Sequence, residues 1–228
     1  LKDDVEEISN IRLGYTGRFV DDSFKATEYN LTVEHASDFP SLDGFLLDDY
    51  YNRDNLSSGW FKIQKNVDKY TVTKNIHSAY AEATYQFTSR WIVNLGLKYD
   101  YVDINVDYNV NRGGSEGSNT IRKDYFLPSL NLKYNLNEKH SLRLGASKTY
   151  TLPQAKEISP YRYVGVNFNS QGNPNLKPSD NYNFDLKWDF NPSPTELVSL
   201  TAFYKHIKDP ISRIEVASAG GYLSYASI

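Results

Sequence analysis

The chain has 228 residues, with 25 Lys and Arg against 28 Asp and Glu, and its length suits one large β domain. The near balance of charge and the lack of a like-charge block exclude the basic surface typical of nucleic-acid-binding proteins. Because Cys is absent, the chain can form neither a disulfide frame nor a thiolate metal site.

Aromatic side chains account for 14% of the residues, and most of them are Tyr. This composition favours β-strands and membrane-interface belts, where an amphipathic ring is useful. No apolar run approaches the roughly 20 residues of a membrane-spanning helix, which excludes a helical membrane protein. A transmembrane β-barrel is not excluded, because the apolar residues of barrel strands alternate with polar ones and form no long apolar run.

The first predicted strand covers about residues 11–20, with apolar and polar side chains in alternation. Residues 21–68 are predicted to form a long, irregular, acidic connection with a short hairpin at 24–33. Four aromatic residues of this connection are candidate ligand contacts at a rim, because rings stack on sugars or planar chelates: Tyr50, Tyr51, Trp60 and Phe61. Loop packing or an interface belt is the favoured alternative for them.

The pattern sharpens between residues 70 and 151. A strand through Phe87 turns tightly at 88–90 into a second strand, 91–107, whose odd-numbered residues from Trp91 to Tyr101 are apolar or aromatic. Residues 108–124 contain a polar, Gly-rich run and are predicted to form a long connection. Residues 125–136 alternate again and turn tightly at 137–140 into the next strand.

A second long loop is predicted at about residues 151–180. The strand that follows alternates clearly, with Tyr182, Phe184, Leu186, Trp188 and Phe190 separated by Asn183, Asp185, Lys187 and Asp189. A turn at 191–195 leads to a strand with Val198, Leu200, Ala202 and Tyr204 on its apolar side. Residues 208–228 are predicted to be a loop or a broken strand.

The connections therefore alternate between short and long. This places the tight turns at one end of an antiparallel meander and the long loops at the other, which is typical of transmembrane barrels with short periplasmic turns and long extracellular loops. The predicted fold class is all-β, a segment of such a barrel. A soluble β-sandwich is the alternative, since one greasy face also suits sheet-on-sheet packing.

The region from Ser141 to Phe190 resembles the later barrel portion of TonB-dependent outer-membrane transporters. The resemblance is carried by a strand ending in Ser147-Lys148-Thr149-Tyr150, by Leu152-Pro153, and by the loop Gly172-Asn173-Pro174-Asn175-Leu176-Lys177-Pro178. Two upstream strands also resemble the family: Leu95-Gly96-Leu97-Lys98-Tyr99-Asp100, and the Bacteroidetes-type Leu127-Pro128-Ser129. The family's usual Glu after the second Pro is replaced here by Ser179-Asp180.

The resemblance covers about residues 70–208. The family has about 22 strands around a plugged lumen, of which this chain supplies about seven to ten. No plug domain or energy-coupling box is evident near residues 1–10. Residues 1–228 are therefore expected to form a partial barrel domain from inside a longer protein.

The resemblance also implies a function in the bacterial outer membrane. A scarce nutrient such as a metal chelate or a glycan would bind at the extracellular loops and plug, and a periplasmic TonB protein would pull on the plug. The wet strand faces would line the lumen, with Asn183, Asp185 and Lys187 as examples. Outer-membrane lipid is the implied surrounding, and neither a cofactor nor enzymatic activity is expected.

The signature loop Asn173, Pro174, Asn175, Leu176, Lys177 and Pro178 is assigned a structural role first, with ligand contact as a secondary hypothesis. Its two prolines restrict φ and keep the preceding residues extended, so the loop should enter the next strand in one direction.

Support for catalysis or a metal site is thin. His35, His77, His140 and His206 are scattered, and solvated or lumen-facing rings are the favoured interpretation. The acid pairs Asp21-Asp22 and Asp48-Asp49 could help to bind Ca²⁺, but no EF-hand spacing surrounds them and solvated charges are favoured. A smaller porin or adhesion barrel, an outer-membrane enzyme and a soluble β-sandwich binding module remain alternative functions.

Overall fold

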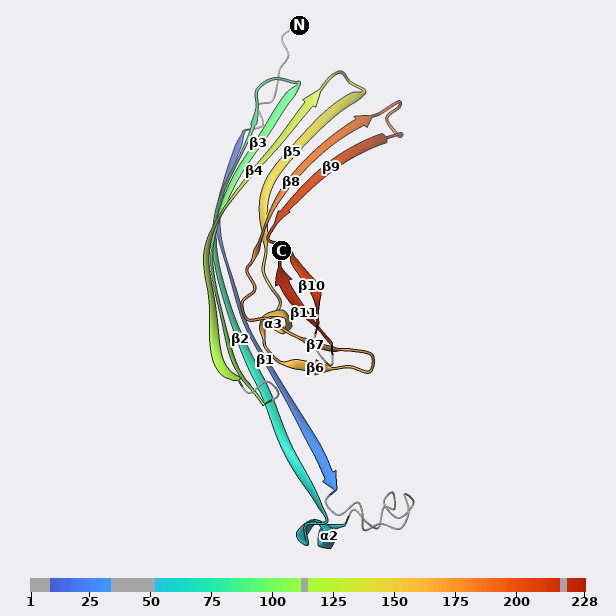
Figure 1. Ribbon diagram of the computed structural model, residues 1–228. Coiled ribbons are helices and arrows are strands. Elements are labelled where there is room, and N and C mark those ends of the chain that lie inside the picture. The colour runs from blue at the N-terminus through green and yellow to red at the C-terminus, as the bar shows by residue number, and fades with distance from the viewer. Residues whose placement is uncertain (1–8, 34–51, 112–114, 218–220) are drawn as a thin grey trace.

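The computed structural model describes residues 9–33, 52–111, 115–217 and 221–228, and β-strands dominate all of these segments. One sheet has seven strands in the order β1-β2-β3-β4-β5-β8-β9, and every neighbouring pair is antiparallel. The sheet curls into a half-barrel (Figure 1). Its strands are β1 (Asn10–Val33), β2 (Phe61–Gln86), β3 (Trp91–Val110), β4 (Ser115–Asn135), β5 (His140–Thr151), β8 (Ser179–Phe190) and β9 (Val198–Lys208). The predicted all-β meander is confirmed.

A smaller sheet lies on the concave side of the half-barrel (Figure 1). Its order is β10-β11-β7-β6, formed by β10 (Ile211–Val216), β11 (Tyr222–Ser227), β7 (Asn169–Gln171) and β6 (Arg162–Val164). Two short helices accompany the strands, α2 (Arg53–Ser57) and α3 (Ala155–Ile158). Within the described residues, no helix is long and apolar enough to cross a membrane.

Three short connections lie at one end of the large sheet, the upper end in Figure 1, as predicted, but residues 111–114 form an equally short connection between β3 and β4 at the opposite end. The three at the upper end join β2 to β3, β4 to β5 and β8 to β9. We call the upper end the short-turn end and the opposite end the long-connection end.

Four regions that were predicted to be loops or irregular are more ordered than expected. The long connection predicted at 108–124 is wrong, because β3 continues to Val110 and β4 begins at Ser115. Residues 21–33 continue β1 and pair with β2 down to Phe61, so the irregular stretch is shorter than the predicted 21–68. The predicted loops 151–180 and 208–228 contain α3, β6 and β7, and β10 and β11, respectively.

The convex face carries a continuous apolar belt in the half of the sheet nearer the short turns. There the outward side chains are large, apolar and exposed, for example Leu13 at 76%, Leu95 at 55% and Leu186 at 50%. Such an exposed belt has no place in a soluble sandwich, because the greasy face of a sandwich strand packs on a second sheet. It matches the lipid-facing band of an outer-membrane barrel.

Aromatic clusters border this apolar belt on both sides. Near the short turns Trp91 stacks on Tyr134 with ring centroids 4.2 Å apart, and His140 stacks on Phe190 at 4.4 Å. At the other border the ring of His77 on β2 lies 6.5 Å from that of Tyr101 on β3 and 6.2 Å from that of Tyr15 on β1, between ring centroids. The ten residue-to-residue steps from Trp91 to Tyr101 span about 33 Å along β3, which a tilt of about 40° converts to a height of about 25 Å. This is the height of a barrel's apolar band.

The polarity of the two faces is exchanged beyond Tyr101. On β3 the outward residues become Asp103, Asn105 and Asp107, while the concave residues Val102, Ile104 and Val106 are 0–1% exposed. The outward polar groups bond to one another: Asn105 accepts hydrogen bonds from Ser118 at 3.1 Å and Thr120 at 2.9 Å. The convex wall formed by β3 and β4 is therefore suited to contact water at the long-connection end, whereas Leu31 on β1 and Ile63 on β2 are exposed apolar residues further out.

The exchanged face supplies the core of the molecule. Concave apolar residues of β2, β3 and β4 pack against the segment between β5 and β8 and against the small sheet; the buried cluster is Tyr70, Val72, Ile76, Val102, Ile104, Val106, Tyr125, Ile158 and Leu176. At the long-connection end, the segment between β5 and β8 and the small sheet therefore cover the concave face of the large sheet. Nearer the short turns the concave wall is open and polar.

Candidate functional site

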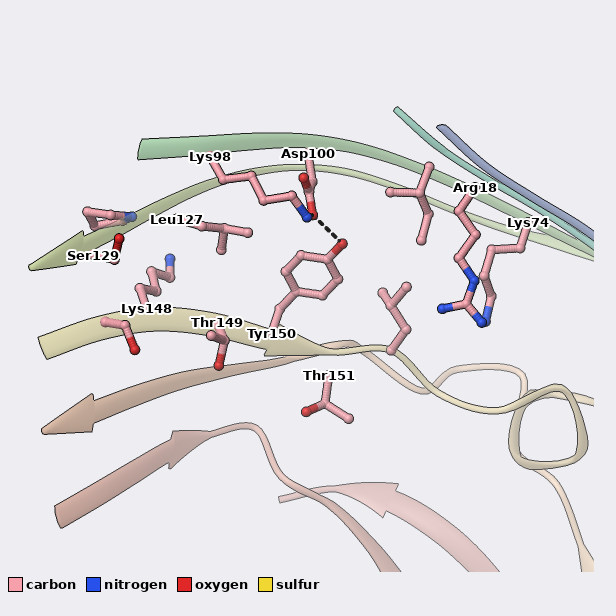
Figure 2. Close-up of a pocket in the computed structure, with 14 residues that line it drawn as sticks. Arg18, Lys74, Lys98, Asp100, Leu127, Ser129, Lys148, Thr149, Tyr150 and Thr151 are labelled. Atoms are coloured by element: carbon pink, nitrogen blue, oxygen red, sulfur yellow. Dashed lines mark hydrogen bonds and ion pairs between the residues drawn. The ribbon is translucent and has the colours of Figure 1, made fainter. Parts of the chain in front are cut away.

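A cavity of about 650 Å³ lies on the concave wall, next to the buried core. Four cations from four strands line it: Arg18 on β1, Lys74 on β2, Lys98 on β3 and Lys148 on β5. We call this cavity the cationic pocket. The alternation of β1 to β3 directs the first three side chains inward, because Arg18, Lys74 and Lys98 share the face of the buried core residues. In Figure 2 the charged ends of Arg18 and Lys74 lie on one side of Tyr150, and Lys148 and the hydroxyl group of Ser129 lie on the other.

Lys148 reaches the pocket by a different route. The pairing of β4 with β5 ends at Ser129 and Ser147, after which β5 separates from β4. The end of β5 then lies over the concave wall, where Lys148 Nζ is 3.5 Å from Asp180 Oδ1. Lys123 Nζ lies 3.5 Å from Asp180 Oδ2, so this carboxylate forms ion pairs with two ammonium groups.

Among the described residues, Asp100 is the one acid in the pocket lining, and it is buried with 1% exposure. Its Oδ2 accepts hydrogen bonds from Tyr150 at 2.7 Å and from Lys98 at 3.0 Å (Figure 2). Its Oδ1 is buried without a partner. The Tyr150 ring stacks on Tyr125 with centroids 3.9 Å apart, which fixes the phenol against the carboxylate.

The pocket lining carries a surplus of positive charge, because its four cations are met by the Asp100 carboxylate in the lining and by Asp180, which pairs with Lys148 from outside it. Among the residues that the structure describes, neither Arg18 nor Lys74 belongs to an ion pair. Figure 2 shows their charged ends side by side. A wall that combines two cations outside ion pairs with hydroxyl donors is suited to bind an anion.

The histidines do not contribute to the pocket, and the lumen-facing placement offered for them is wrong, because His77, His140 and His206 stand on the outward face. His77 lies on the outward face, where its Nδ1 is 2.7 Å from Tyr15 Oη and its ring contacts Phe19 edge-on at 5.3 Å. His140 and His206 also lie among outward aromatic rings. The rings are amphipathic and fit the border of an apolar belt. His35 lies outside the described residues.

No catalytic or metal centre is formed by the described part of the chain. It contains no group of three or more His, Asp or Glu side chains that could hold a metal ion. Asp21 and Asp22 are strand residues of β1 opposite Thr73 and Val72. Asp48-Asp49 lies outside the described residues.

The signature loop is packed rather than free. Leu176 is 3% exposed and Pro178 is buried, whereas Asn175 and Lys177 are exposed. The amide of Asn173 donates to the carbonyl of Tyr225 at 2.9 Å, and the Lys177 backbone N–H donates to Ser227 Oγ at 2.9 Å. A further hydrogen bond links the Asn119 amide to the carbonyl of Pro174. These contacts tie the loop to β11 and β4.

The predicted rim aromatics are placed only in part. Phe61 is the first residue of β2 and is 3% exposed, and Trp60 precedes it in a bend. Tyr50 and Tyr51 lie outside the described residues. The structure thus brings neither Trp60 nor Phe61 to the cationic pocket. The sequence pattern did not single out the pocket cations. Arg18 stands on the polar face of the first predicted strand, so the charged residues on the polar faces of the predicted strands could have indicated the pocket.

Comparison with known proteins identifies the fold. Residues 5–227 match the family model described as TonB dependent receptor-like, beta-barrel. The chain is 28% identical over 170 residues to the probable TonB-dependent siderophore receptor PirA of Acinetobacter baumannii, covering 70% of this chain and 20% of that protein. It is 32% identical over 91 residues to the iron-regulated outer membrane virulence protein of Vibrio cholerae, covering 40% of this chain and 14% of that protein.

Solved structures share the architecture. The copper transporter OprC superimposes with a TM-score of 0.55 at 12% identity, over 73% of this chain and 29% of that one. The Serratia marcescens hemophore receptor HasR, solved with its hemophore and heme, superimposes with a TM-score of 0.53 at 11% identity, over 96% and 38%. At these identities the likeness concerns the fold. The chain spans less than half the length of the relatives it matches.

Proposed function

The chain belongs to the TonB-dependent receptor-like β-barrel family, and from this membership we propose that it forms part of the wall of an importer that takes up a nutrient as an anionic chelate. The family consists of outer-membrane receptors and transporters rather than enzymes. The observation that carries the substrate class is the cationic pocket, in which neither Arg18 nor Lys74 belongs to an ion pair among the described residues, although the Asp22 carboxylate interacts with Lys74 at longer range.

Several features favour an anionic chelate over the other candidates. A neutral glycan would leave the unpaired cations of the pocket without partners. A bare copper ion prefers thiolate and thioether ligands in its reduced state, and these 228 residues contain neither Cys nor Met. The relative from Acinetobacter is named as a siderophore receptor, and siderophore chelates commonly carry carboxylate or catecholate oxygens.

The remaining parts of the mechanism follow from family membership. The short turns face the periplasm and the long connections face the outside, so ligand enters from the end where β1 meets β2 and β3 meets β4. A plug segment in the lumen, coupled to a periplasmic TonB protein, would release the ligand inward. A Bacteroidetes origin remains a prediction carried by Leu127-Pro128-Ser129.

The test is ligand binding and uptake by the full-length protein. A panel of ferric catecholate, hydroxamate and citrate chelates is titrated by fluorescence quenching, and uptake of radioactive iron is followed in cells that lack other receptors. Lys74→Gln is expected to weaken binding of the anionic chelates about tenfold, because a hydrogen bond to a charged group contributes about 1.5–3 kcal/mol. Lys65→Gln removes the same charge from an exposed site outside the pocket and serves as the control.

The proposal fails if the protein binds none of the anionic chelates, or if Lys74→Gln and Lys65→Gln have equal effects. Preferential binding of a neutral oligosaccharide would assign the pocket to a glycan importer instead. Uptake that continues unchanged without TonB would indicate a passive porin.

A further inference from the structure

A second set of cations occupies the concave wall near the short-turn end, outside the cationic pocket. Lys133 on β4, Arg143 on β5 and Lys187 on β8 stand directly opposite one another in the register of the sheet. We call these three residues the cationic row. Together with Arg90 and Lys139 from the adjacent turns, they line a cavity of about 660 Å³.

The acids of this cavity do not balance the row. Asp189 is 5% exposed at its side chain and lies 3.0 Å from Lys187 Nζ and 3.5 Å from Arg143 Nε. It also accepts a 2.5 Å hydrogen bond from Ser199. Lys133 belongs to no ion pair within the described segments, and neither does Glu138, the other acid that lines the cavity.

Such a row is unfavourable by itself. Like charges at directly opposed positions of an antiparallel pair repel, and here the repulsion acts across two successive pairs. A bound oxyanion would offset it, and the guanidinium of Arg143 has the planar fork that matches carboxylate and phosphate oxygens.

The row is connected to the cationic pocket along the same strands. A smaller cavity of about 390 Å³ lies on β3, β4, β5 and β8 and includes all three residues of the row. On β4 and β5 the pocket residues Ser129 and Ser147 are four positions from Lys133 and Arg143. The wall between the two sites is polar, with Asn131 and Asp185 facing inward.

We propose that the cationic row is a second anion site, which receives carboxylate or phosphate groups of the ligand on the periplasmic side of the lumen. This inference rests on the proposed function, because it gives the row the same ligand as the cationic pocket, at a later position on the path. The two sites then present positive charge in sequence along one wall.

The experiment is calorimetric titration of the full-length protein in detergent micelles with citrate and with inorganic pyrophosphate at low ionic strength, where charge interactions are least screened. Wild-type protein is expected to show two classes of site. Lys133→Gln, which breaks no ion pair, is expected to weaken one class about tenfold. Lys74→Gln is expected to weaken the other class of site, and Lys65→Gln is expected to weaken neither class.

Lys133→Glu provides a second measurement. The new carboxylate stands opposite Arg143, so we expect loss of the Lys133-sensitive class together with a higher thermal unfolding temperature in the absence of ligand. A lower unfolding temperature would overturn the electrostatic reading of the row. The affinities for citrate and for pyrophosphate show whether the site prefers carboxylate or phosphate groups. Binding of either anion supports the proposal.

The other outcomes separate this inference from the proposed function. If only the Lys74-sensitive class exists, the row is not an anion site although the importer proposal stands. If neither class exists, the anionic substrate itself is wrong. If the Lys133-sensitive site binds a tetraglutamate peptide but neither citrate nor pyrophosphate, the row contacts an acidic protein segment and the inference is overturned.

Discussion

The phenol of Tyr150 donates a 2.7 Å hydrogen bond to the carboxylate of Asp100, although their strands, β5 and β3, are not neighbours in the sheet. The contact arises because β5 separates from β4 beyond Ser147 and passes over the concave wall. It fastens the end of β5 to the wall and closes one side of the cationic pocket.

Tyr150→Phe should destabilise the protein while leaving its shape intact. The variant leaves the buried Asp100 with Lys98 as its remaining partner, and we expect a loss of about 1–3 kcal/mol in the free energy of unfolding. Urea titration in detergent micelles measures it. Tyr204→Phe, on an exposed outward ring, is the control and should change stability little. Equal effects of the two variants would mean that the hydrogen bond contributes nothing.

Gly14→Val tests the packing of β1 on β2. The ring of Tyr80 lies over Gly14, its partner in the register, so that a Cβ at this glycine would overlap the phenol. Moving the ring should cost about 1–3 kcal/mol, the usual range for overpacking. Thr16→Val, two residues further along the same face, is the control. A variant as stable as wild type would show that Tyr80 is free to move away.

Leu97→Lys tests the position of the membrane on the convex face. Leu97 is 49% exposed in the middle of the apolar belt, where a cation facing lipid should cost about 2–4 kcal/mol. Thr71→Lys places the same charge on the outward face beyond the polarity exchange, next to Asp107, and should cost about 0–1 kcal/mol. The two variants are compared by urea unfolding from lipid vesicles. Equal costs would place the boundary of the bilayer elsewhere.

The alternation of side chains predicted the membrane-embedded part of the fold because one rule, apolar outward and polar inward, holds there. The strand read from Tyr182 to Phe190 lies within β8. The rule fails beyond Tyr101, where Val102, Ile104 and Val106 face inward against the chain's own β5–β8 segment. Water replaces lipid outside, so the alternation keeps its period while its apolar and polar faces are exchanged. The predicted strand 91–107 includes these residues, but an apolar-outward rule gives them the wrong faces.

The candidate site was predictable only in part for a related reason. Arg18 follows from the polar face of β1, but Lys148 enters the cationic pocket because β5 leaves the sheet after Ser147. On a regular strand Lys148 would share the outward face of Ala146 and Leu144. The separation of β5 is a tertiary feature, set by the packing of Tyr150 on Tyr125, and no local pattern encodes it.

Leu176→Ala tests whether the signature loop is primarily structural. Leu176 is 3% exposed in the core that also contains Ile104 and Ile158, so truncation should cost about 2–5 kcal/mol. Lys177→Ala changes the adjacent exposed side chain and should leave stability unchanged. Both variants are measured by urea unfolding and by titration with the anionic chelates. If Leu176→Ala keeps full stability while Lys177→Ala loses binding, the loop serves ligand contact and its structural role is secondary.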